Sequence, residues 1–205
     1  MTAARGKNKP HTITQPLALL LLTLPAWQPF VRTASLPCTH DNIFHYYRIT
    51  AMREALKFGW FFSRWIPNLA LGFGYPFFNY REPLPYWTGE LLFFLGIPLP
   101  LVLGLFYAGS LVCAAWGAYT LSRDLFGDRA AWVGALAYGL GPYLLLDAYR
   151  RGNLPESIAL ALIPWLLVHF RRLIMHGGWG RFIRTSVLLV ALFLSHNISS
   201  LLLVP

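Results

Sequence analysis

Charged residues are scarce in this chain: Asp, Glu, Lys and Arg together make up 12% of its 205 residues, and only eight residues are acidic. A soluble domain usually carries about 25% charged residues, so too little polar sequence is present to cover a set of buried apolar helices. Cysteine is nearly absent as well. We expect no disulfide, because Cys113 lies inside an apolar block and Cys38 lies just outside another. No Cys-x-x-Cys pair or His/Cys cluster with metal-ligand spacing occurs, so we predict no metal site.

Apolar residues, by contrast, make up 56% of the chain and fall in blocks at 16–30, 98–121, 130–146 and 187–204. As helices, blocks of roughly 17–25 apolar residues match the hydrocarbon thickness of a bilayer, where only internal hydrogen bonds can satisfy the backbone. We therefore predict an all-α fold, a polytopic transmembrane helix bundle that forms a single domain over residues 1–205. The expected spans, about five in number, are 15–31, 99–121, 130–146, 157–170 and 185–205, with a short interfacial or re-entrant helix at 87–97.

The distribution of basic residues predicts the topology. Arg5, Lys7 and Lys9 precede the first apolar block, and arginines recur in the short segments 122–129 and 171–184. Because short cytoplasmic loops are enriched in Lys and Arg, we place the N-terminus and both segments in the cytoplasm. The long segment 32–86 is then the first extracytoplasmic loop of a multi-pass protein of the cell membrane. The net charge of +9 has the same explanation, and the chain has no recognisable basic module for nucleic acid. We expect the lipid bilayer as a partner, and no nucleic acid.

The start of the extracytoplasmic loop holds a cluster of ionisable residues. In a helix, Asp41, His45 and Arg48 share one face, at positions i, i+4 and i+7. A carboxylate, an imidazole and a guanidinium together suit proton transfer beside a bound anion. The simpler alternative is that Asp41 or Thr39 only caps the helix and that His45 is a structural residue.

Glycine, proline and aromatic residues alternate through the rest of this loop. They form the strings Arg64-Trp65-Ile66-Pro67, Gly72-Phe73-Gly74-Tyr75-Pro76 and Tyr80-Arg81-Glu82-Pro83-Leu84. Prolines and glycines favour defined turns, and aromatic residues favour the membrane interface. The strings are therefore consistent with an ordered loop on the membrane surface as well as with a binding site.

A second polar segment, at 147–156, falls on the same side of the membrane in this topology. Arg150 and Arg151 suit bidentate contacts to a phosphate at the lipid surface, although snorkelling arginines also serve as interfacial anchors. Glu156 opens an apolar helix, and His196 and Asn197 lie within the last expected span. Polar side chains at such depth usually pack between helices and often mark a functional site.

Taken together, these motifs resemble the first outer loop of the GT-C-like polytopic membrane glycosyltransferases. The resemblance covers nearly the whole chain and is carried by Asp41-x-x-x-His45, by the three strings above, by Tyr149-Arg150-Arg151-Gly152-Asn153-x-x-Glu156 and by Leu194-Ser195-His196-Asn197. Within that group the chain most resembles the bacterial membrane family labelled "6-pyruvoyl-tetrahydropterin synthase-related". The label does not imply the chemistry of the soluble pterin enzyme, because the three-histidine zinc spacing is absent.

The resemblance implies an enzyme that transfers a sugar from a polyprenyl-phosphate-linked donor on the outer face of the membrane. Asp41 would be the general base or a carboxylate that orients the acceptor, with His45 as a second catalytic residue. The substrate-binding candidates are Arg48, Arg64, Tyr80, Arg150, Arg151, Glu156 and His196. The acceptor stays open, and so does the cofactor, for which a divalent cation is one option. The sequence departs from better-known members in one respect: Asn42 stands where they carry a second acid.

Members of this superfamily are far longer and have more spans, so we expect this chain to be an N-terminal fragment whose activity on its own stays open. Two alternatives to an enzyme also stay open. One is a transporter or flippase of lipid-linked anions, which would place polar residues at mid-membrane in broken helices, as His196, Asn197 and the segment 139–142 suggest. The other is a non-catalytic membrane protein.

Overall fold

The computed structural model describes residues 14–33, 35, 37–59 and 64–203, and this part of the chain is all-helical, as predicted. No residue in these ranges belongs to a strand, and an isolated antiparallel bridge joins Ile66 and Tyr75. Two 3-10 turns, η1 (Ala70–Gly72) and η2 (Phe77–Asn79), and a π-helical turn, η3 (Asp147–Arg151), lie between the α-helices. The α-helices are α1 (Thr14–Leu22), α2 (Leu24–Arg32), α3 (Asn42–Lys57), α4 (Leu84–Phe94), α5 (Leu99–Phe126), α6 (Asp128–Gly139), α7 (Pro142–Leu146), α8 (Leu154–His176), α9 (Trp179–Ser195) and α10 (Asn197–Leu203). The basic residues Arg5, Lys7 and Lys9, on which the predicted orientation partly rests, lie outside the described residues.

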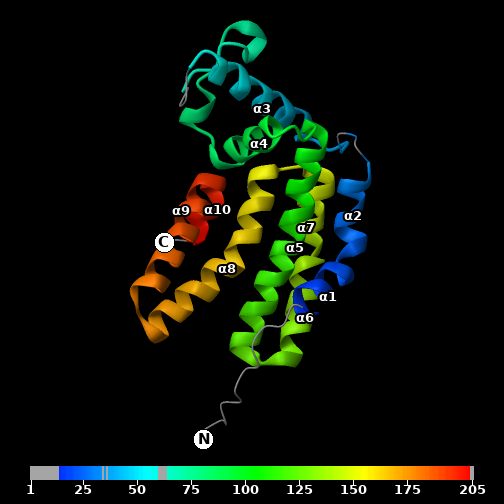
Figure 1. Ribbon diagram of the computed structural model, residues 1–205, viewed down its shortest axis with the longest axis vertical. Helices are drawn as coiled ribbons and strands as arrows, with labels where there is room; N and C mark the ends of the chain where they lie inside the picture. Colours follow the sequence, from blue (N-terminus) through cyan, green and yellow to red (C-terminus); the bar gives the residue numbers. More distant parts are fainter. Residues whose placement is uncertain (1–13, 34, 36, 60–63, 204–205) are drawn as a thin grey trace, which may run out of the picture.

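The bundle is built around α5, and α2, α6 and α8 pack along this helix (Figure 1). Small residues at the contacts let the backbones approach closely. A Cβ atom on Gly104 of α5 would overlap the carbonyl oxygen of Phe30 in α2, and one on Gly139 of α6 would lie 2.5 Å from the Cβ of Ala115. Small residues of this kind are typical of helices that associate inside a membrane.

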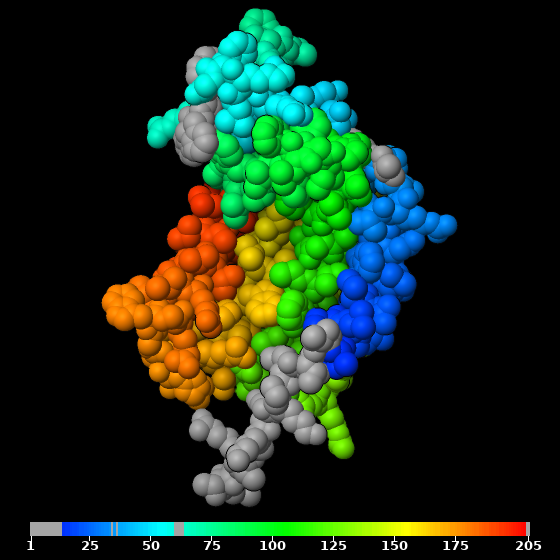
Figure 2. All heavy atoms as spheres, viewed as in Figure 1, coloured from blue at the N-terminus to red at the C-terminus, as the bar shows by residue number. Residues whose placement is uncertain are grey.

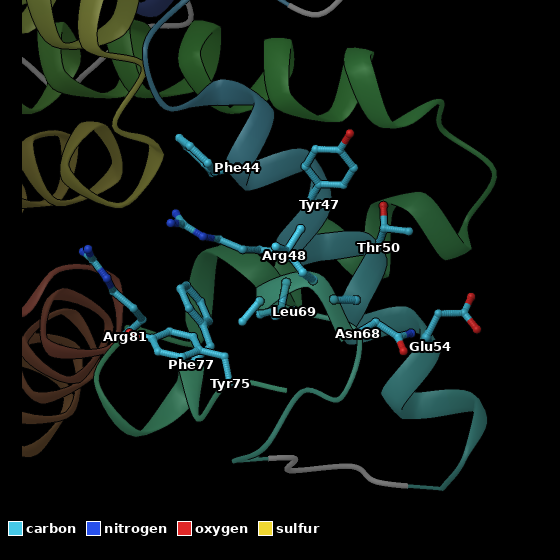
Figure 3. A pocket seen from close by; sticks show the side chains of 13 residues that line it. Phe44, Tyr47, Arg48, Thr50, Glu54, Asn68, Leu69, Tyr75, Phe77 and Arg81 are labelled. Carbon is cyan, nitrogen blue, oxygen red and sulfur yellow. The ribbon is translucent and has the colours of Figure 1, made fainter. Parts of the chain in front are cut away.

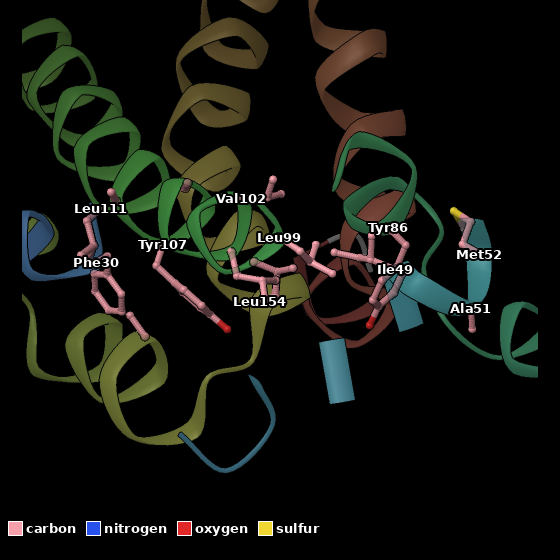
Figure 4. Close-up of a cluster of buried hydrophobic side chains, with 14 of the residues drawn as sticks. Phe30, Ile49, Ala51, Met52, Tyr86, Leu99, Val102, Tyr107, Leu111 and Leu154 are labelled. Carbon is pink, nitrogen blue, oxygen red and sulfur yellow. The ribbon is translucent and has the colours of Figure 1, made fainter. Parts of the chain in front are cut away.

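The main apolar core connects the bundle to the predicted extracytoplasmic loop. Tyr107 of α5 is fully buried and stacks on Phe30, with 5.2 Å between the ring centroids. At the other end of the same cluster, Ile49 of α3 and Tyr86 of α4 are also fully buried (Figure 4). Leu154 at the start of α8 is fully buried in the same cluster. The loop is therefore held to the bundle by a continuous core.

Two helices, α5 and α8, are long and apolar enough to cross a membrane, which indicates membrane association. Both are longer than predicted, because α5 continues to Phe126 and α8 runs from Leu154 to His176. The other three predicted spans are each divided into two shorter helices. Five continuous spans are therefore not observed, and a five-span topology remains a prediction.

The physical reason for these divisions differs from one pair to the next. Between α1 and α2 the Thr23 hydroxyl donates to the carbonyl of Leu19 at 2.7 Å, and Pro25 follows in the first turn of α2. Between α6 and α7 stands Gly141-Pro142, and a proline lacks the amide that would continue the first helix. Between α9 and α10, His196 adopts an extended backbone conformation.

Helices α3 and α4 form a layer across one end of the bundle, and their atoms cover that end in the space-filling view (Figures 1 and 2). The helix predicted around Asp41 and Arg48 is present as α3. The short helix predicted at 87–97 is α4, which begins earlier because Pro85 fits its first turn, and ends before Gly96, whose φ is +90°. The Arg53 guanidinium of α3 lies 3.6 Å from the Glu90 carboxylate of α4, which ties the two helices together.

Candidate functional site

The two polar segments of the sequence meet at this end of the bundle. The backbone amide of Asp41 donates to the carbonyl of Arg151 at 2.9 Å, and that of His40 donates to the carbonyl of Arg150 at 3.1 Å. Gly152 has φ +67°, and a Cβ atom there would overlap the side chain of Thr39. The turn before α3 and the turn before α8 are therefore pressed together, and glycine is required at the point of closest approach.

A cavity of about 570 Å³ opens beside this junction. Six of the nine predicted site residues line it: Asp41, His45, Arg48, Arg151, Glu156 and His196. They come from α3, η3, α8 and the break between α9 and α10, so the site is assembled from segments that are far apart in the sequence. The remaining lining residues are Phe44, Arg81, Tyr143, Asn153, Pro155, Ile198, Ser199 and Leu202.

The other three predicted site residues lie outside the cavity lining. Arg64 and Arg150 are exposed, and Arg150 contributes only its carbonyl to the junction with His40. Tyr80 is 67% exposed, and its carbonyl accepts a bond from the Asn197 side chain at 3.4 Å. The sequence places both polar segments on one side of the membrane, and this predicts that Asp41, Arg150 and Glu156 face one cavity. Arg151 occupies the place expected for Arg150.

The Asp41 carboxylate is available for chemistry. Asp41 is the N-cap of α3, but its side chain makes no capping hydrogen bond. The cap is supplied instead by Thr39, whose Oγ1 accepts from the amide of Asn42 at 3.2 Å. Among the described residues, no hydrogen-bond or ion-pair partner contacts the Asp41 side chain, which is half-buried in the cavity wall. Of the two residues considered as the cap, Thr39 therefore fills that role and Asp41 does not.

Asn42 has a structural role. Its side chain is fully buried. The amide nitrogen donates to the carbonyl of Pro37 at 3.0 Å, and the amide oxygen accepts from the Tyr107 hydroxyl at 3.3 Å. An ionised aspartate could not donate to the Pro37 carbonyl. Asn42 therefore holds the start of α3 against Tyr107 of α5.

His45 is held as a neutral imidazole. It is 1% exposed, and its Nε2 accepts from the amide of Leu154 at 3.3 Å. This bonding pattern assigns the ring proton to Nδ1, which then donates to the Tyr86 hydroxyl at 3.0 Å. Burial, reinforced by the charge of Arg48, lowers the pKa of His45 to about 3. Because proton transfer near neutral pH needs a pKa closer to the working pH, this geometry suits a positioning role better than a general base.

Arg48 is oriented by the same group of residues. Its guanidinium donates to the Tyr86 hydroxyl at 3.3 Å and lies 4.7 Å from the ring centroid of Phe77. Burial raises the pKa of Tyr86 to about 12, so the phenol stays protonated. Figure 3 shows that the guanidinium groups of Arg48 and Arg81 extend in the same direction. Both residues line the 570 Å³ cavity as well as a neighbouring cavity of about 730 Å³ between α3 and residues 68–81.

Arg151 is already neutralised by two carboxylates. One of its terminal nitrogens lies 2.8 Å from the Glu156 carboxylate and 3.1 Å from that of Asp147. The Tyr143 hydroxyl donates to Glu156, and Asn153 Nδ2 donates to the same carboxylate at 2.9 Å. Glu156 is therefore engaged by three side chains, which favours a role in holding the site together.

Asp147 is an unexpected member of this group. It is fully buried, and its carboxylate accepts from the Ser157 hydroxyl at 2.7 Å. Burial raises the pKa of Asp147 to about 6, against the opposing effects of the Ser157 bond and the Arg151 charge. Asp147 directly follows the apolar block 130–146. A carboxylate at the end of such a block could have identified it as a site residue from the sequence.

Arg81, Tyr143 and Asn153 line the cavity but were not among the predicted site residues. Arg81 follows Tyr80 in one of the three strings of the loop, and the sequence prediction named Tyr80 as the binding residue instead of Arg81.

His196 is 5% exposed, and its Nδ1 lies 2.8 Å from the Ser199 hydroxyl. Among the described residues, no group of three or more His, Cys, Asp or Glu side chains could hold a metal ion.

The described part of the chain is an all-helical fold in which two helices are long and apolar enough to cross a membrane. The chain is similar to an uncharacterized protein of Lactococcus lactis subsp. cremoris (strain MG1363), with 24% identity over 194 residues. The alignment covers 92% of this chain and 31% of that protein, so the chain spans about a third of the relative that it matches. No family model matches the chain, and no solved structure matches it.

Proposed function

We propose that the chain is part of a multi-pass membrane glycosyltransferase of the GT-C-like type, which transfers a sugar from a polyprenyl-phosphate donor at the outer face of the membrane. One observation carries the proposal: the Asp41 carboxylate is unpartnered in a cavity that also contains the guanidinium groups of Arg48 and Arg81. This places a base beside cations that suit a phosphate.

The reaction is a displacement at the anomeric carbon of the donor sugar. Asp41 would accept the proton of an acceptor hydroxyl, whose oxygen forms a bond to that carbon. The bond between this carbon and the phosphate oxygen breaks, and the phosphate leaves with the electron pair. Arginines aimed at the leaving oxygens stabilise the charge that develops there.

Arg48 and Arg81 are better suited to hold the phosphate than Arg151 is. Arg151 is shared between the carboxylates of Asp147 and Glu156, which compensate its charge. Arg48 is fixed by Tyr86 and Phe77 and makes no ion pair with a described carboxylate, and Arg81 is exposed beside it. Guanidinium groups bind phosphate oxygens in a bidentate manner, so these two form the preferred phosphate site.

The lipid part of the donor fits the wall formed by α10. Ile198 and Leu202 line the cavity and are also 62% and 82% exposed. Leu201 in the same helix is 76% exposed. Apolar side chains that are open both to the cavity and to the outside provide a path for a prenyl chain from the membrane.

Farnesyl phosphate and farnesol test the phosphate site, because they share a prenyl chain and differ in the phosphate. In detergent, farnesyl phosphate should bind the wild type and should bind Arg81→Gln about fivefold or more weakly, since one charge-assisted contact is lost. Arg150→Gln removes the same charge outside the cavity and should bind normally. Equal binding of farnesol and farnesyl phosphate, or an equal effect of both substitutions, would contradict the proposed donor site.

A transporter or flippase of lipid-linked anions is favoured by a different observation. The pairs α6/α7 and α9/α10 are broken helices, and the second break falls at the buried polar residue His196. Transporters commonly place binding sites at such breaks. The two functions differ in their product, because a transporter leaves the sugar–phosphate bond of the lipid intact and a transferase cleaves it.

A further inference from the structure

A second charged cavity, of about 630 Å³, lies where α5 meets α6 and α8 meets α9. In Figure 1 this is the end of the bundle that lies away from α3 and α4. Five arginines and two histidines are among the described residues that line it, against a single acid, Asp124. Sequence reasoning attributed these arginines to the general bias of cytoplasmic loops. Their assembly around one cavity from two separate segments was not expected.

Two of the five arginines are neutralised locally. The guanidinium of Arg172 binds the Asp124 carboxylate through two nitrogens, at 2.7 and 3.1 Å. Arg123 pairs with Asp128 at 2.7 Å. The first pair joins α8 to α5, and the second joins α5 to α6 across the turn between them. These residues therefore have a structural role in building the cavity.

The other three, Arg171, Arg181 and Arg184, have no ion-pair partner among the described residues. Arg181 donates to the carbonyl of Gly177 at 2.8 Å, which directs its side chain back over the turn. Three like charges around one cavity repel one another, and the repulsion is relieved when an anion binds between them. The cavity therefore has the charge of an anion site.

Exposed apolar side chains near the lining residues in the sequence indicate where the anion comes from. Ile174 is 70% exposed and precedes the lining residue Met175, Phe182 is 50% exposed and follows the lining residue Arg181, and Trp179, two residues before Arg181, is 78% exposed. Exposed aromatic and aliphatic side chains beside arginines are typical of the membrane interface, and basic pockets between helices at that depth bind lipid head groups. We propose that this cavity binds the phosphate group of an anionic membrane lipid.

Lipid binding to the purified protein in neutral detergent tests the site, with short-chain phosphatidylglycerol, phosphatidylcholine and inorganic phosphate as the probes. The double variant Arg181→Gln/Arg184→Gln should bind phosphatidylglycerol roughly 25-fold more weakly, or about fivefold for each arginine removed. Both side chains are exposed, so the helices should keep their content and thermal midpoint. Arg129→Gln/Arg150→Gln is the matched control, because it removes two exposed arginines that do not line this cavity.

The three probes separate the sources of the phosphate. Preference for phosphatidylglycerol over both phosphatidylcholine and inorganic phosphate supports a lipid head group. If inorganic phosphate binds as tightly as phosphatidylglycerol, the lipid assignment is overturned. Equal binding of the two lipids, or an equal loss in the control variant, would overturn the site itself. Arg181→Lys/Arg184→Lys keeps the charge and should restore most of the binding. None of these outcomes depends on the donor cavity at the other end of the bundle.

Discussion

The close approach of Gly152 to Thr39 permits a direct test of how the two polar segments are joined. Gly152→Ala has two separate consequences. The alanine must adopt a left-handed backbone at φ +67°, and its Cβ atom must displace the Thr39 side chain. The Thr39 hydroxyl also caps α3 through the amide of Asn42, so the displacement disturbs the start of the helix that carries Asp41.

The expected loss of stability is the sum of these effects. The left-handed conformation costs an alanine about 1–2 kcal/mol, and overpacking a tight contact costs about 1–3 kcal/mol more. We therefore expect Gly152→Ala to lower the free energy of unfolding by about 2–5 kcal/mol. Gly96→Ala is the matched control: Gly96 has φ +90°, but no atom lies within 4 Å of its Cβ position. Only the conformational effect applies there.

Reversible unfolding in detergent, followed by circular dichroism, measures both variants. A second substitution, Thr39→Gly, removes the obstructing side chain and should make Gly152→Ala less costly than it is alone, which a double-mutant cycle detects. If Gly152→Ala destabilises no more than Gly96→Ala, or if the two substitutions at 39 and 152 are additive, then the segments before α3 and α8 do not meet as described.

Three further predictions concern titration and topology. The pKa of His45 is about 3 in the folded protein, so below about pH 6.5 the unfolded chain binds a proton at this residue and the folded chain does not. The stability contributed by His45 should therefore fall with decreasing pH. The destabilisation by His45→Asn should be about 2 kcal/mol smaller at pH 5 than at pH 7.5. For Asp147 the dependence of stability on pH has the opposite sign. Its pKa is raised to about 6, so between about pH 4 and pH 6 the folded chain keeps a proton that the unfolded chain releases, and stability should fall as the pH rises through this range. Asp147→Asn should remove up to roughly 3 kcal/mol of that fall. In each case an unchanged difference between variant and wild type across the pH range would show that the group does not titrate as described. A membrane-impermeant thiol reagent applied from outside should label a cysteine introduced at Asn68 and spare one at Gly178, and the reverse pattern would refute the proposed orientation.

The helical class and much of the cavity could be predicted from the sequence, because both depend on local patterns. Apolar blocks identified the helices, and the i, i+4, i+7 spacing placed Asp41, His45 and Arg48 on one helical face, all of which line the cavity. Assigning the second polar segment to the same end also placed Glu156 correctly. These inferences need only the helical repeat and the bilayer thickness.

What could not be predicted depends on tertiary contacts and on local departures from α-helical geometry. Residues 147–151 form a π-helical turn, which changes the angle between neighbouring side chains. Of the two arginines in this turn, both of which were predicted, Arg151 lines the cavity and Arg150 does not. The break at Thr23 divides a block that looked continuous by hydropathy, whereas the breaks near Gly141 and His196 fall where the sequence suggested broken helices. Thr39 was one of the two candidate caps, and the structure assigns the cap to it. The neutral state of His45 follows from partners that no sequence spacing reveals.

The proposed function depends most directly on the Asp41 carboxylate. Asp41→Asn keeps the shape of the side chain, and no hydrogen bond within the described structure depends on its charge. Sugar transfer from a labelled polyprenyl-phosphate hexose, measured in membrane vesicles that contain the protein, should fall by about 100-fold or more if Asp41 is the general base. Binding of farnesyl phosphate should persist, and Glu54→Gln, which alters a half-buried carboxylate of α3 that pairs with Lys57 and does not line this cavity, should leave transfer intact. Normal transfer by Asp41→Asn would contradict the account.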